Sequence, residues 1–470
     1  MVDLSRRKWI AIAGTTGVAM AASGALSAVS AAIPVGQPPG NPFHETAMTC
    51  SVLEFGAKGD AKKDNTAAFQ KALDAVHFAG GGSVIVPAGR YLFKGHLDLP
   101  AATALVGAYA GPPAGNFSPN SGKGSLLLPM EGRGKPDGPA FISVRGVNAV
   151  IRGLAIYYPE QLASAAAPAP YPWTIQNGRF PLGKPPLGED GPTGLSVIDV
   201  NISNAYQGID LTLAGRHYIS RVFGRPILTG IYVDQCYDCG RIENVHFIAS
   251  FWTDDKSPMD TWIQNHGTAF RFGRSDEQYV FNTFCFQYHT GYHFVETPSG
   301  SCYGSFLGIG ADTAHHPVLV DSVENVVGLH ITNGEFSAQV GKKLQAMVIG
   351  PRNAGPVNMT NCAFWDNHRF GTIQGTGSVS LLGCHFFSWN QHEHSEPSIL
   401  CDGPLVIING CIWHSRFRHT GKEALIRITK HCAGAIITGN ASQSHTAFIV
   451  EHPRSLPEAR FQIHSNIALG

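Results

Sequence analysis

The sequence is poor in charge and lacks long apolar runs. Only 14% of its residues are charged, and 34 basic side chains balance 34 acidic ones, so the formal net charge is zero. A neutral chain has no electrostatic attraction for nucleic acid or for an anionic membrane surface, which argues against both as partners. Beyond the N-terminal region no stretch of about 18 apolar residues occurs, so we expect no membrane span in the mature protein.

The ten cysteines lack the spacing of a metal site. Cys236 and Cys239 form a lone CxxC without a second pair, which indicates a tight turn or a local disulfide. Cys362, Cys384 and Cys411 lie in similar apolar segments, so we expect them to be buried thiols and not disulfides. The sequence therefore predicts no metal centre and no cofactor, with calcium expected only if the protein is a lyase.

The N-terminus has the features of an export signal. Arg6 and Arg7 precede a mild apolar run, and small residues surround Ala28–Ala32. Residues 1–32 therefore resemble a twin-arginine signal peptide, with an ordinary secretory signal as the alternative. Residues 33–47, rich in Pro and Gly, are expected to be a disordered leader. We expect a periplasmic or secreted protein with a single folded domain over residues 48–470.

Two strand types alternate from about residue 195 onward. The first includes Gly208–Leu211, Gly230–Val233 and Gly291–Phe294, and the second includes Ile242–Phe247 and Ile331–Phe336. The first type recurs at a spacing of roughly 25 residues, which is typical of a solenoid. Because the strands are rich in β-branched residues and no helical periodicity separates them, the expected fold is all-β, a right-handed parallel β-helix with a short N-terminal capping helix.

The N-terminal part of this domain carries ordered motifs. They are Phe55–Asp60, Asp64–Leu73, Gly80–Tyr91 and Leu105–Gly107. This segment resembles the start of the pectate lyase superfamily, in the rhamnogalacturonase and epimerase-like branch. The resemblance implies a β-helix and carbohydrate-active chemistry, commonly on acidic polysaccharides. Its residues are fold markers: Thr66–Phe78 is expected to be an amphipathic helix that covers the open end of the β-helix, with Asp64 near its N-cap.

The catalytic motifs of that superfamily are not reproduced. Polygalacturonases of the superfamily carry Asn-Thr-Asp, Asp-Asp, His-Gly and Arg-Ile-Lys on successive coils. Here Asp254-Asp255 and His266-Gly267 fall within one loop, Arg427 to Lys430 is interrupted, and Asn-Thr-Asp does not occur. No calcium-dependent lyase motif can be matched residue by residue either. The site residues must therefore be sought from their distribution along the coils.

The connections that follow the second strand type are long and rich in Trp, His, Asp and Arg. Homologous loops of a solenoid lie on one side, so we expect these residues to line one edge and form its main groove. The predicted catalytic residues are Asp254, Asp255, Asp312 and Asp366. The predicted substrate-binding residues are Trp252, Tyr288, His289, Trp365, His368, Arg369, Trp389, His392 and Glu393.

Paired carboxylates on this edge predict an exported glycoside hydrolase that cleaves a polysaccharide. Asp312 would lie two coils, about 10 Å, from Asp254 and from Asp366, within reach of either with side-chain lean. The alternatives are a polysaccharide lyase that acts by β-elimination on a uronate polymer, and a non-catalytic glycan-binding or adhesin β-helix. The expected partner is a polysaccharide or oligosaccharide, and nothing in the sequence indicates an oligomer.

Overall fold

The computed structural model describes residues 48–109, 124–178, 192–248, 252, 256–339, 344–389, 396–415, 424–443, 448–453 and 457–469. These residues lie within one compact unit of the chain. The predicted signal and leader, residues 1–47, lie outside the described residues. Over the described residues, no helix is long and apolar enough to cross a membrane.

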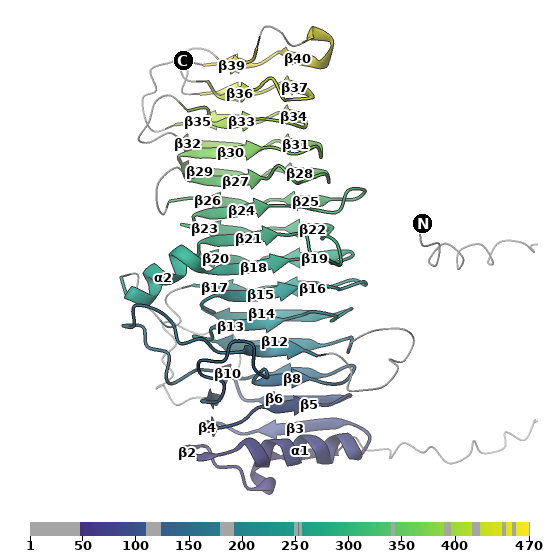
Figure 1. Cartoon of the computed structure of the whole chain (residues 1–470), viewed down its shortest axis with the longest axis vertical. Helices are drawn as coiled ribbons and strands as arrows, with labels where there is room; N and C mark the ends of the chain where they lie inside the picture. The colour runs from purple at the N-terminus through teal and green to yellow at the C-terminus, as the bar shows by residue number, and fades with distance from the viewer. Residues whose placement is uncertain are drawn as a thin grey trace, which may run out of the picture. The chain divides into compact units, whose positions relative to one another are not determined.

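Each coil contributes strands to three parallel sheets, which stack in sequence order from α1 (Thr66–Phe78) to β40 (Figure 1). Sheet 1 contains β1 (Met48–Ser51), β3 (Gly82–Val86), β6 (Thr103–Gly107), β9 (Val150–Arg152), β12 (Ser196–Ile202), β14 (Tyr218–Gly224), β16 (Arg241–Glu243), β19 (Gln278–Phe281), β22 (Gly304–Leu307), β25 (Leu329–Thr332), β28 (Val357–Thr360), β31 (Val379–Leu382), β34 (Leu405–Asn409), β37 (Gly434–Thr438) and β40 (Phe461–His464).

Sheet 2 shares β12 and β14 with sheet 1, and sheet 3 is separate. Sheet 2 otherwise contains β2 (Asp60–Asp64), β4 (Gly89–Phe93), β7 (Ser125–Pro129), β10 (Ala155–Ile156), β17 (His246–Phe247), β20 (Phe284–Phe286), β23 (Gly310–Asp312), β26 (Glu335–Ser337), β29 (Ala363–Asn367), β32 (His385–Trp389), β35 (Ile412–His414), β38 (Ala441–Ser442) and β41 (Ile467–Ala468). Sheet 3 contains β5 (Leu97–Leu99), β8 (Ile142–Val144), β11 (Trp173–Asn177), β13 (Gln207–Asp210), β15 (Thr229–Val233), β18 (Thr268–Phe272), β21 (Thr290–Phe294), β24 (His316–Val320), β27 (Gln345–Ile349), β30 (Arg369–Ile373), β33 (Ile399–Cys401), β36 (Ile426–Ile428) and β39 (Val450–Glu451). The predicted parallel β-helix is confirmed.

A one-residue bend separates sheet 1 from sheet 2 in most coils. Asn244, Asn333 and Asn361 make this bend with φ values of 54°, 54° and 53°, and Gly383 and Gly410 make it with 62° and 66°. Asn and Gly are the residues that enter this left-handed region most readily. The second strand type of the sequence is therefore not one strand but two, for example β25 and β26. The cross-section has three sheets where the sequence suggested two.

The N-terminal end of the stack is covered by helix α1, as predicted. Its buried face, which includes Phe69, Leu73 and Val76, packs over the first coils. The helix begins at Thr66, whose backbone N–H and hydroxyl both donate to the Asp64 carboxylate at 3.0 and 2.7 Å. Asp64 thus satisfies a free N–H of the first turn, which is the role expected of a capping residue.

Side chains that point inward form columns along the stack. Phe336, Phe364, Phe386 and Trp413 follow one another on successive coils, with ring centroids 5.5, 5.1 and 4.6 Å apart. These separations match the roughly 4.8 Å spacing of neighbouring strands. Each ring of this column therefore packs against the rings of the coils above and below it.

Cys362, Cys384 and Cys411 form a similar inward column, each directly after a bend residue. All three are at most 1% exposed, and all ten cysteines of the chain are free. Their thiols lie within 3.4 to 3.8 Å of carbonyl oxygens of the preceding coil. The prediction of buried thiols is confirmed, and Cys236 and Cys239 are free thiols that form no disulfide.

Helix α2 (Pro258–His266) is inserted between β17 and β18, on the side where sheet 2 leads to sheet 3 (Figure 1). A fully buried ion pair joins its Asp260 to Arg225, with side chains 1% and 0% exposed. Arg225 also donates to the carbonyl of Gln287 at 3.1 Å and lies 5.8 Å from the Tyr288 ring. This pair therefore ties the inserted helix to the turn between β20 and β21.

Removal of one partner of this buried pair should destabilise the protein strongly. Asp260→Asn leaves the Arg225 charge uncompensated in the interior, and we expect a loss of about 3–5 kcal/mol. The control is Asp238→Asn, because Asp238 pairs with Arg216 at the surface, with side chains 43% and 48% exposed, where a pair contributes about 0–1 kcal/mol. Urea unfolding followed by fluorescence measures both variants. Equal unfolding midpoints for the two variants would contradict the assignment of Asp260 and Arg225 as a buried ion pair.

The cysteines should differ sharply in reactivity. Cys239 is partly exposed and the other nine are buried, so a maleimide should label Cys239 alone in the native protein. A hydrogen bond to Glu277 raises the pKa of Cys239 to about 11, so this labelling should accelerate with rising pH. Mass spectrometry of the native protein and of Cys239→Ser measures it. Rapid labelling of Cys362, Cys384 or Cys411 would mean that the column does not exist.

Candidate functional site

Most predicted site residues lie on one edge of the β-helix, where sheet 2 leads to sheet 3. Asp312 ends β23, Asp366 lies in β29 and Trp389 ends β32. Trp252 lies in the connection from β17 to α2, on the same side. The strand order thus confirms that the long connections share one edge. The remaining described candidates on this edge are Tyr288, His289, Trp365, His368 and Arg369.

The predicted carboxylate pairs are placed only in part. Asp254 and Asp255 lie outside the described residues, as do His392 and Glu393, so their roles stay predictions. Asp312 and Asp366 are separated by two coils, because β23 pairs with β26 and β26 with β29. This separation is about 10 Å, at or beyond the upper limit for the two carboxyl groups of a glycosidase.

Two predicted binding residues point into the core, which corrects the prediction for both. Tyr288 and Trp389 are each 0% exposed. The Tyr288 hydroxyl donates to the carbonyl of Pro226 at 2.7 Å, and the Trp389 ring packs 6.1 Å from Phe370. Each follows a residue with positive φ, Gln287 at 59° and Ser388 at 56°. Such a bend interrupts the alternation of the strand and turns the next side chain inward.

Trp365 and Arg369 stay at the surface of this edge, both partly exposed. Arg369 forms an ion pair with Glu396 and donates to the Thr372 hydroxyl at 3.1 Å. Its guanidinium is thus engaged with its own chain. Trp365 offers a partly exposed ring of the kind that stacks on sugars.

A second set of polar side chains lies on the outer face of sheet 3. Tyr232, Arg271 and His293 occupy the same register position on β15, β18 and β21, three successive coils. Each stands between two buried neighbours in its strand, so all three point outward. Neighbouring strands are about 4.8 Å apart, so the three side chains form a continuous row. We call Tyr232, Arg271 and His293 the outer row.

His293 ends the outer row as half of a dyad. Its Nε2 lies 2.9 Å from Oδ2 of Asp321, so the neutral ring donates from Nε2 and keeps the lone pair of Nδ1. Burial lowers the pKa of His293 below its ordinary value of 6.5, Asp321 opposes this shift, and Arg271 adds to it. The imidazole is therefore neutral at physiological pH and is able to accept a proton.

Arg271 occupies the centre of the outer row and is exposed. Its guanidinium lies 5.5 Å from the Tyr232 ring, over which it forms a cation–π contact. The Tyr232 hydroxyl donates to Asp234 at 3.2 Å, and burial raises the pKa of Tyr232. Trp173 stacks beside the same ring at 6.4 Å. The row thus offers one cation, one neutral base, one phenol and an aromatic face.

Two carboxylates lie beside Tyr232, on adjacent coils. Asp210 pairs with Tyr232 in the register of sheet 3, and Asp234 follows the end of β15. Asp210 accepts hydrogen bonds from Gln176 and Thr212. Burial raises the pKa of Asp210, and the nearby Asp234 raises it further. A carboxyl group with a raised pKa next to a second carboxylate is an arrangement suited to acid–base chemistry.

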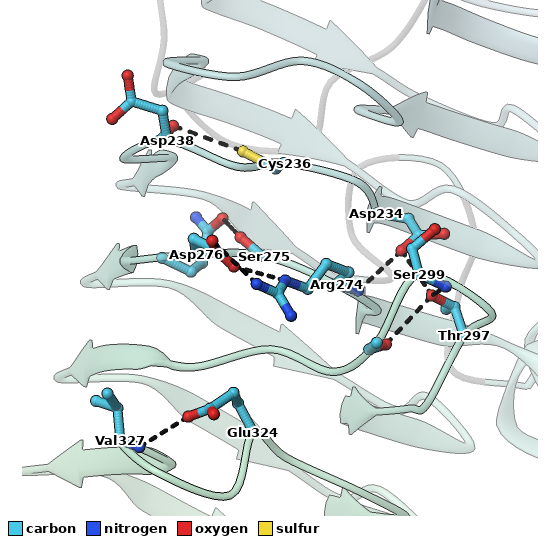
Figure 2. Close-up of polar contacts among 12 residues, drawn as sticks. Asp234, Cys236, Asp238, Arg274, Ser275, Asp276, Thr297, Ser299, Glu324 and Val327 are labelled. Carbon is cyan, nitrogen blue, oxygen red and sulfur yellow. Dashed lines mark hydrogen bonds and ion pairs between the residues drawn. The ribbon is translucent and has the colours of Figure 1, made fainter. Parts of the chain in front are cut away.

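The turns from sheet 3 to sheet 1 hold Asp234 in place. Its Oδ1 accepts from the backbone N–H of Arg274 at 2.8 Å and from the hydroxyl of Thr297 at 3.0 Å (Figure 2). Arg274 in turn donates from Nε to Asp276 at 2.6 Å. Asp234 is therefore fixed by neighbours on the next two coils. These hydrogen bonds form an ordered network beside the outer row, in the turns from sheet 3 to sheet 1.

The outer row was present in the sequence but was not recognised as a site. Tyr232, Arg271 and His293 are each the fourth residue of their strands, β15, β18 and β21, and strand alternation places that residue opposite to its buried neighbours. The sequence prediction rested on loops, where insertions are frequent. A comparison of the same position across coils would have found the row.

Residues 49–178 match a family described as rhamnogalacturonase A/epimerase, pectate lyase-like. The match covers the segment whose motifs suggested the superfamily, and it confirms that resemblance. The outer row lies beyond the matched residues.

Two curated proteins of Azotobacter vinelandii are similar to a short part of the chain. Alginate lyase 7 is 54% identical over 48 residues, which are 10% of this chain and 6% of that protein. Mannuronan C5-epimerase AlgE3 is also 54% identical over 48 residues, 10% of this chain and 3% of that protein. The similar stretch is therefore a small part of each relative's length.

Solved structures share the fold at low sequence identity. The N-terminal fragment of bacteriophage phi29 gene product 12 has a TM-score of 0.56 and 13% identity, over 89% of this chain and 70% of that chain. DFA-IIIase from Arthrobacter chlorophenolicus A6 in complex with GF2 has a TM-score of 0.53 and 10% identity, over 89% and 99%. These likenesses establish the fold alone.

Proposed function

We propose, from the premise that this chain is a pectate lyase-like β-helix protein, that it is a carbohydrate-active enzyme acting on a uronate polysaccharide by proton abstraction and β-elimination. The observation that carries the proposal is the outer row, in which Arg271 stands between the His293 base and the Tyr232 phenol in strand register. The names of the curated relatives, an alginate lyase and a mannuronan epimerase, agree with chemistry on a polysaccharide.

Arg271 supplies the charge that such a reaction needs. A sugar carboxylate bound to the guanidinium loses much of its negative charge, and the proton on the adjacent carbon then becomes more acidic. The outer face of sheet 3 runs along the stack, so a polymer bound along it would meet Tyr232, Arg271 and His293 in succession. In this proposal the guanidinium takes the part that calcium takes in calcium-dependent lyases, and no cofactor is required.

His293 and Tyr232 complete the reaction as base and acid. Nδ1 of His293 takes the proton from the carbon that bears the carboxylate. The electron pair left on that carbon forms a carbon–carbon double bond, and the bond to the glycosidic oxygen breaks. That oxygen takes the proton of the Tyr232 hydroxyl. Asp321 holds the imidazole in the required tautomer and stabilises the imidazolium that forms.

Hydrolysis is the second candidate, and the Asp210–Asp234 arrangement favours it. Asp210, with its raised pKa, would be the general acid, and Asp234 on the adjacent coil the second carboxylate. The edge residues Asp312 and Asp366 fit this role less well, because they are two coils apart.

A purely glycan-binding protein would bind the polymer without releasing product. Whether the protein acts by elimination, by hydrolysis or by binding alone, we propose that it is exported and meets its polysaccharide in the periplasm or outside the cell.

Substitutions in the outer row should distinguish the residue that abstracts the proton from the residue that binds the sugar carboxylate. His293→Gln should lower kcat by about 10²–10⁴ with little change in KM, because it removes proton abstraction. Arg271→Met should raise KM and lower kcat together. The control is Arg427→Met, since Arg427 occupies the same outward position on β36, six coils farther along than Arg271. The assays are absorbance of unsaturated products, reducing ends, and deuterium uptake from solvent on a panel of polyuronates and neutral glycans.

Three results decide between the candidates. Unsaturated product that is lost in His293→Gln supports elimination. Deuterium uptake without cleavage assigns epimerisation at the same site. Reducing ends without unsaturation, lost in Asp210→Asn or in Asp312→Asn but kept in His293→Gln, would refute the proposal in favour of hydrolysis.

The pH dependence should follow the His293 base. The imidazole must be neutral to accept a proton, and its pKa lies below 6.5. The rate kcat/KM should therefore rise with pH and reach half its maximum below pH 6.5. Asp321→Asn removes an interaction that raises this pKa, so the midpoint should move to still lower pH while the plateau falls. Because the pKa of Tyr232 is raised above 10, no alkaline limb is expected below that pH. A half-maximum above pH 6.5 would exclude His293 as the base.

A further inference from the structure

Three histidines converge beside the outer row, where two turns enter sheet 3. His289 precedes β21, and His315 and His316 stand at the start of β24, one coil farther. The rings of His289 and His315 are 4.8 Å apart, and those of His315 and His316 are 4.4 Å apart. One ring nitrogen of each lies within 4.8 Å of one ring nitrogen of the other two.

Two of these rings have buried nitrogens without a partner. Nδ1 of His315 and Nδ1 of His316 are both inaccessible to solvent and make no hydrogen bond within the part of the chain that the structure describes. A buried polar atom without a partner is costly and uncommon in folded proteins. The ring nitrogens of His315 and His316 are therefore available as metal ligands, and one cation could bind several of them at once.

The backbone and the neighbouring side chains hold the three rings in place. The backbone N–H of His316 donates to the carbonyl of His289 at 2.8 Å, and that of His289 donates to Ile263 in helix α2 at 3.2 Å. Nδ1 of His289 lies 3.1 Å from the Thr290 hydroxyl, which leaves Nε2 for a ligand. Such an outer contact fixes the orientation of a metal-binding imidazole. The Arg225–Asp260 pair braces the same turn from within the core.

We propose that His289, His315 and His316 bind one divalent transition-metal ion of the zinc class. Three imidazoles that hold such an ion in a tetrahedral site lie about 3.4 Å from one another at their nitrogens, so small ring rotations from the observed positions suffice. Imidazole ligands select zinc, copper, iron or nickel, whereas calcium requires oxygen ligands. This site is independent of the function proposed above and is distinct from the dyad of His293 and Asp321.

Three histidine ligands would leave the fourth position of a tetrahedral ion open. His289 lies four residues before His293 and just outside β21. A three-histidine site with a free fourth position binds water or an anionic ligand. The site would thus hold water or a small anion at that position, whatever reaction the protein carries out.

Direct metal titration tests the proposal on the full chain. The protein is stripped with a chelator and titrated with Zn²⁺ by calorimetry and with Co²⁺ by absorption, which reports four-coordinate geometry. We expect one ion per chain, with intense visible Co²⁺ bands. Single Ala variants of His289, His315 and His316 should each weaken binding by more than about 100-fold. Thr290→Val should weaken it by about 10–100-fold, because it removes the contact that orients His289.

Two matched controls locate the site. His330→Ala removes an exposed imidazole on sheet 1, away from the cluster. Cys239→Ser removes a thiol from the other described group with metal-ligating side chains, Asp238, Cys239 and Glu277. Both controls should bind Zn²⁺ as the wild type does. Absence of binding at micromolar Zn²⁺, a Co²⁺ spectrum of six-coordinate type, or wild-type affinity in the three Ala variants would overturn the proposal.

Discussion

The bend between sheet 1 and sheet 2 is the constraint on which the rest of the structure depends. A strand that slips by one residue exposes its buried face, and a solenoid must avoid this slip in every coil. A single left-handed residue, such as Asn244, Asn361 or Gly410, makes each bend with the same length and direction. The strands that follow therefore enter sheet 3 in a constant register. Equivalent positions such as Tyr232 and Arg271 come into line only because this register is kept.

The same bend explains which parts of the fold could be predicted from the sequence. The helix Thr66–Phe78, the coil period and the inward Cys362 follow from local pattern and were all found. The third sheet was missed because a one-residue bend leaves the apolar pattern of Ile331–Phe336 almost unbroken. Only the left-handed conformation of Asn333 divides it into two strands, and Asn also occurs where no bend is made.

Side-chain direction at the edge could not be predicted for a related physical reason. Tyr288 and Trp389 follow polar residues, and a regular continuation of the strand would have placed them outside. The positive φ of Gln287 and of Ser388 reverses that direction. Neither residue type predicts such a conformation, since Gln and Ser rarely adopt a left-handed backbone conformation. The rings of Tyr288 and Trp389 fill space in the core. Tertiary packing therefore determines the backbone conformation at this edge more than the local preference of Gln287 and Ser388 does.

The position of the outer row on regular strands has a chemical consequence. Acid–base groups must be held within a fraction of an ångström to act together, and strands hold side chains more rigidly than loops do. Arg271 is flanked at one strand spacing by His293 and Tyr232, so a carboxylate bound at the guanidinium lies between a base and an acid. The turns from sheet 3 to sheet 1 add Asp321 after β24 and Asp234 after β15, which orient His293 and Tyr232 through direct hydrogen bonds. In the proposed reaction, the β-helix would set the spacing of the acid–base groups along the polymer, and the turns would orient each group.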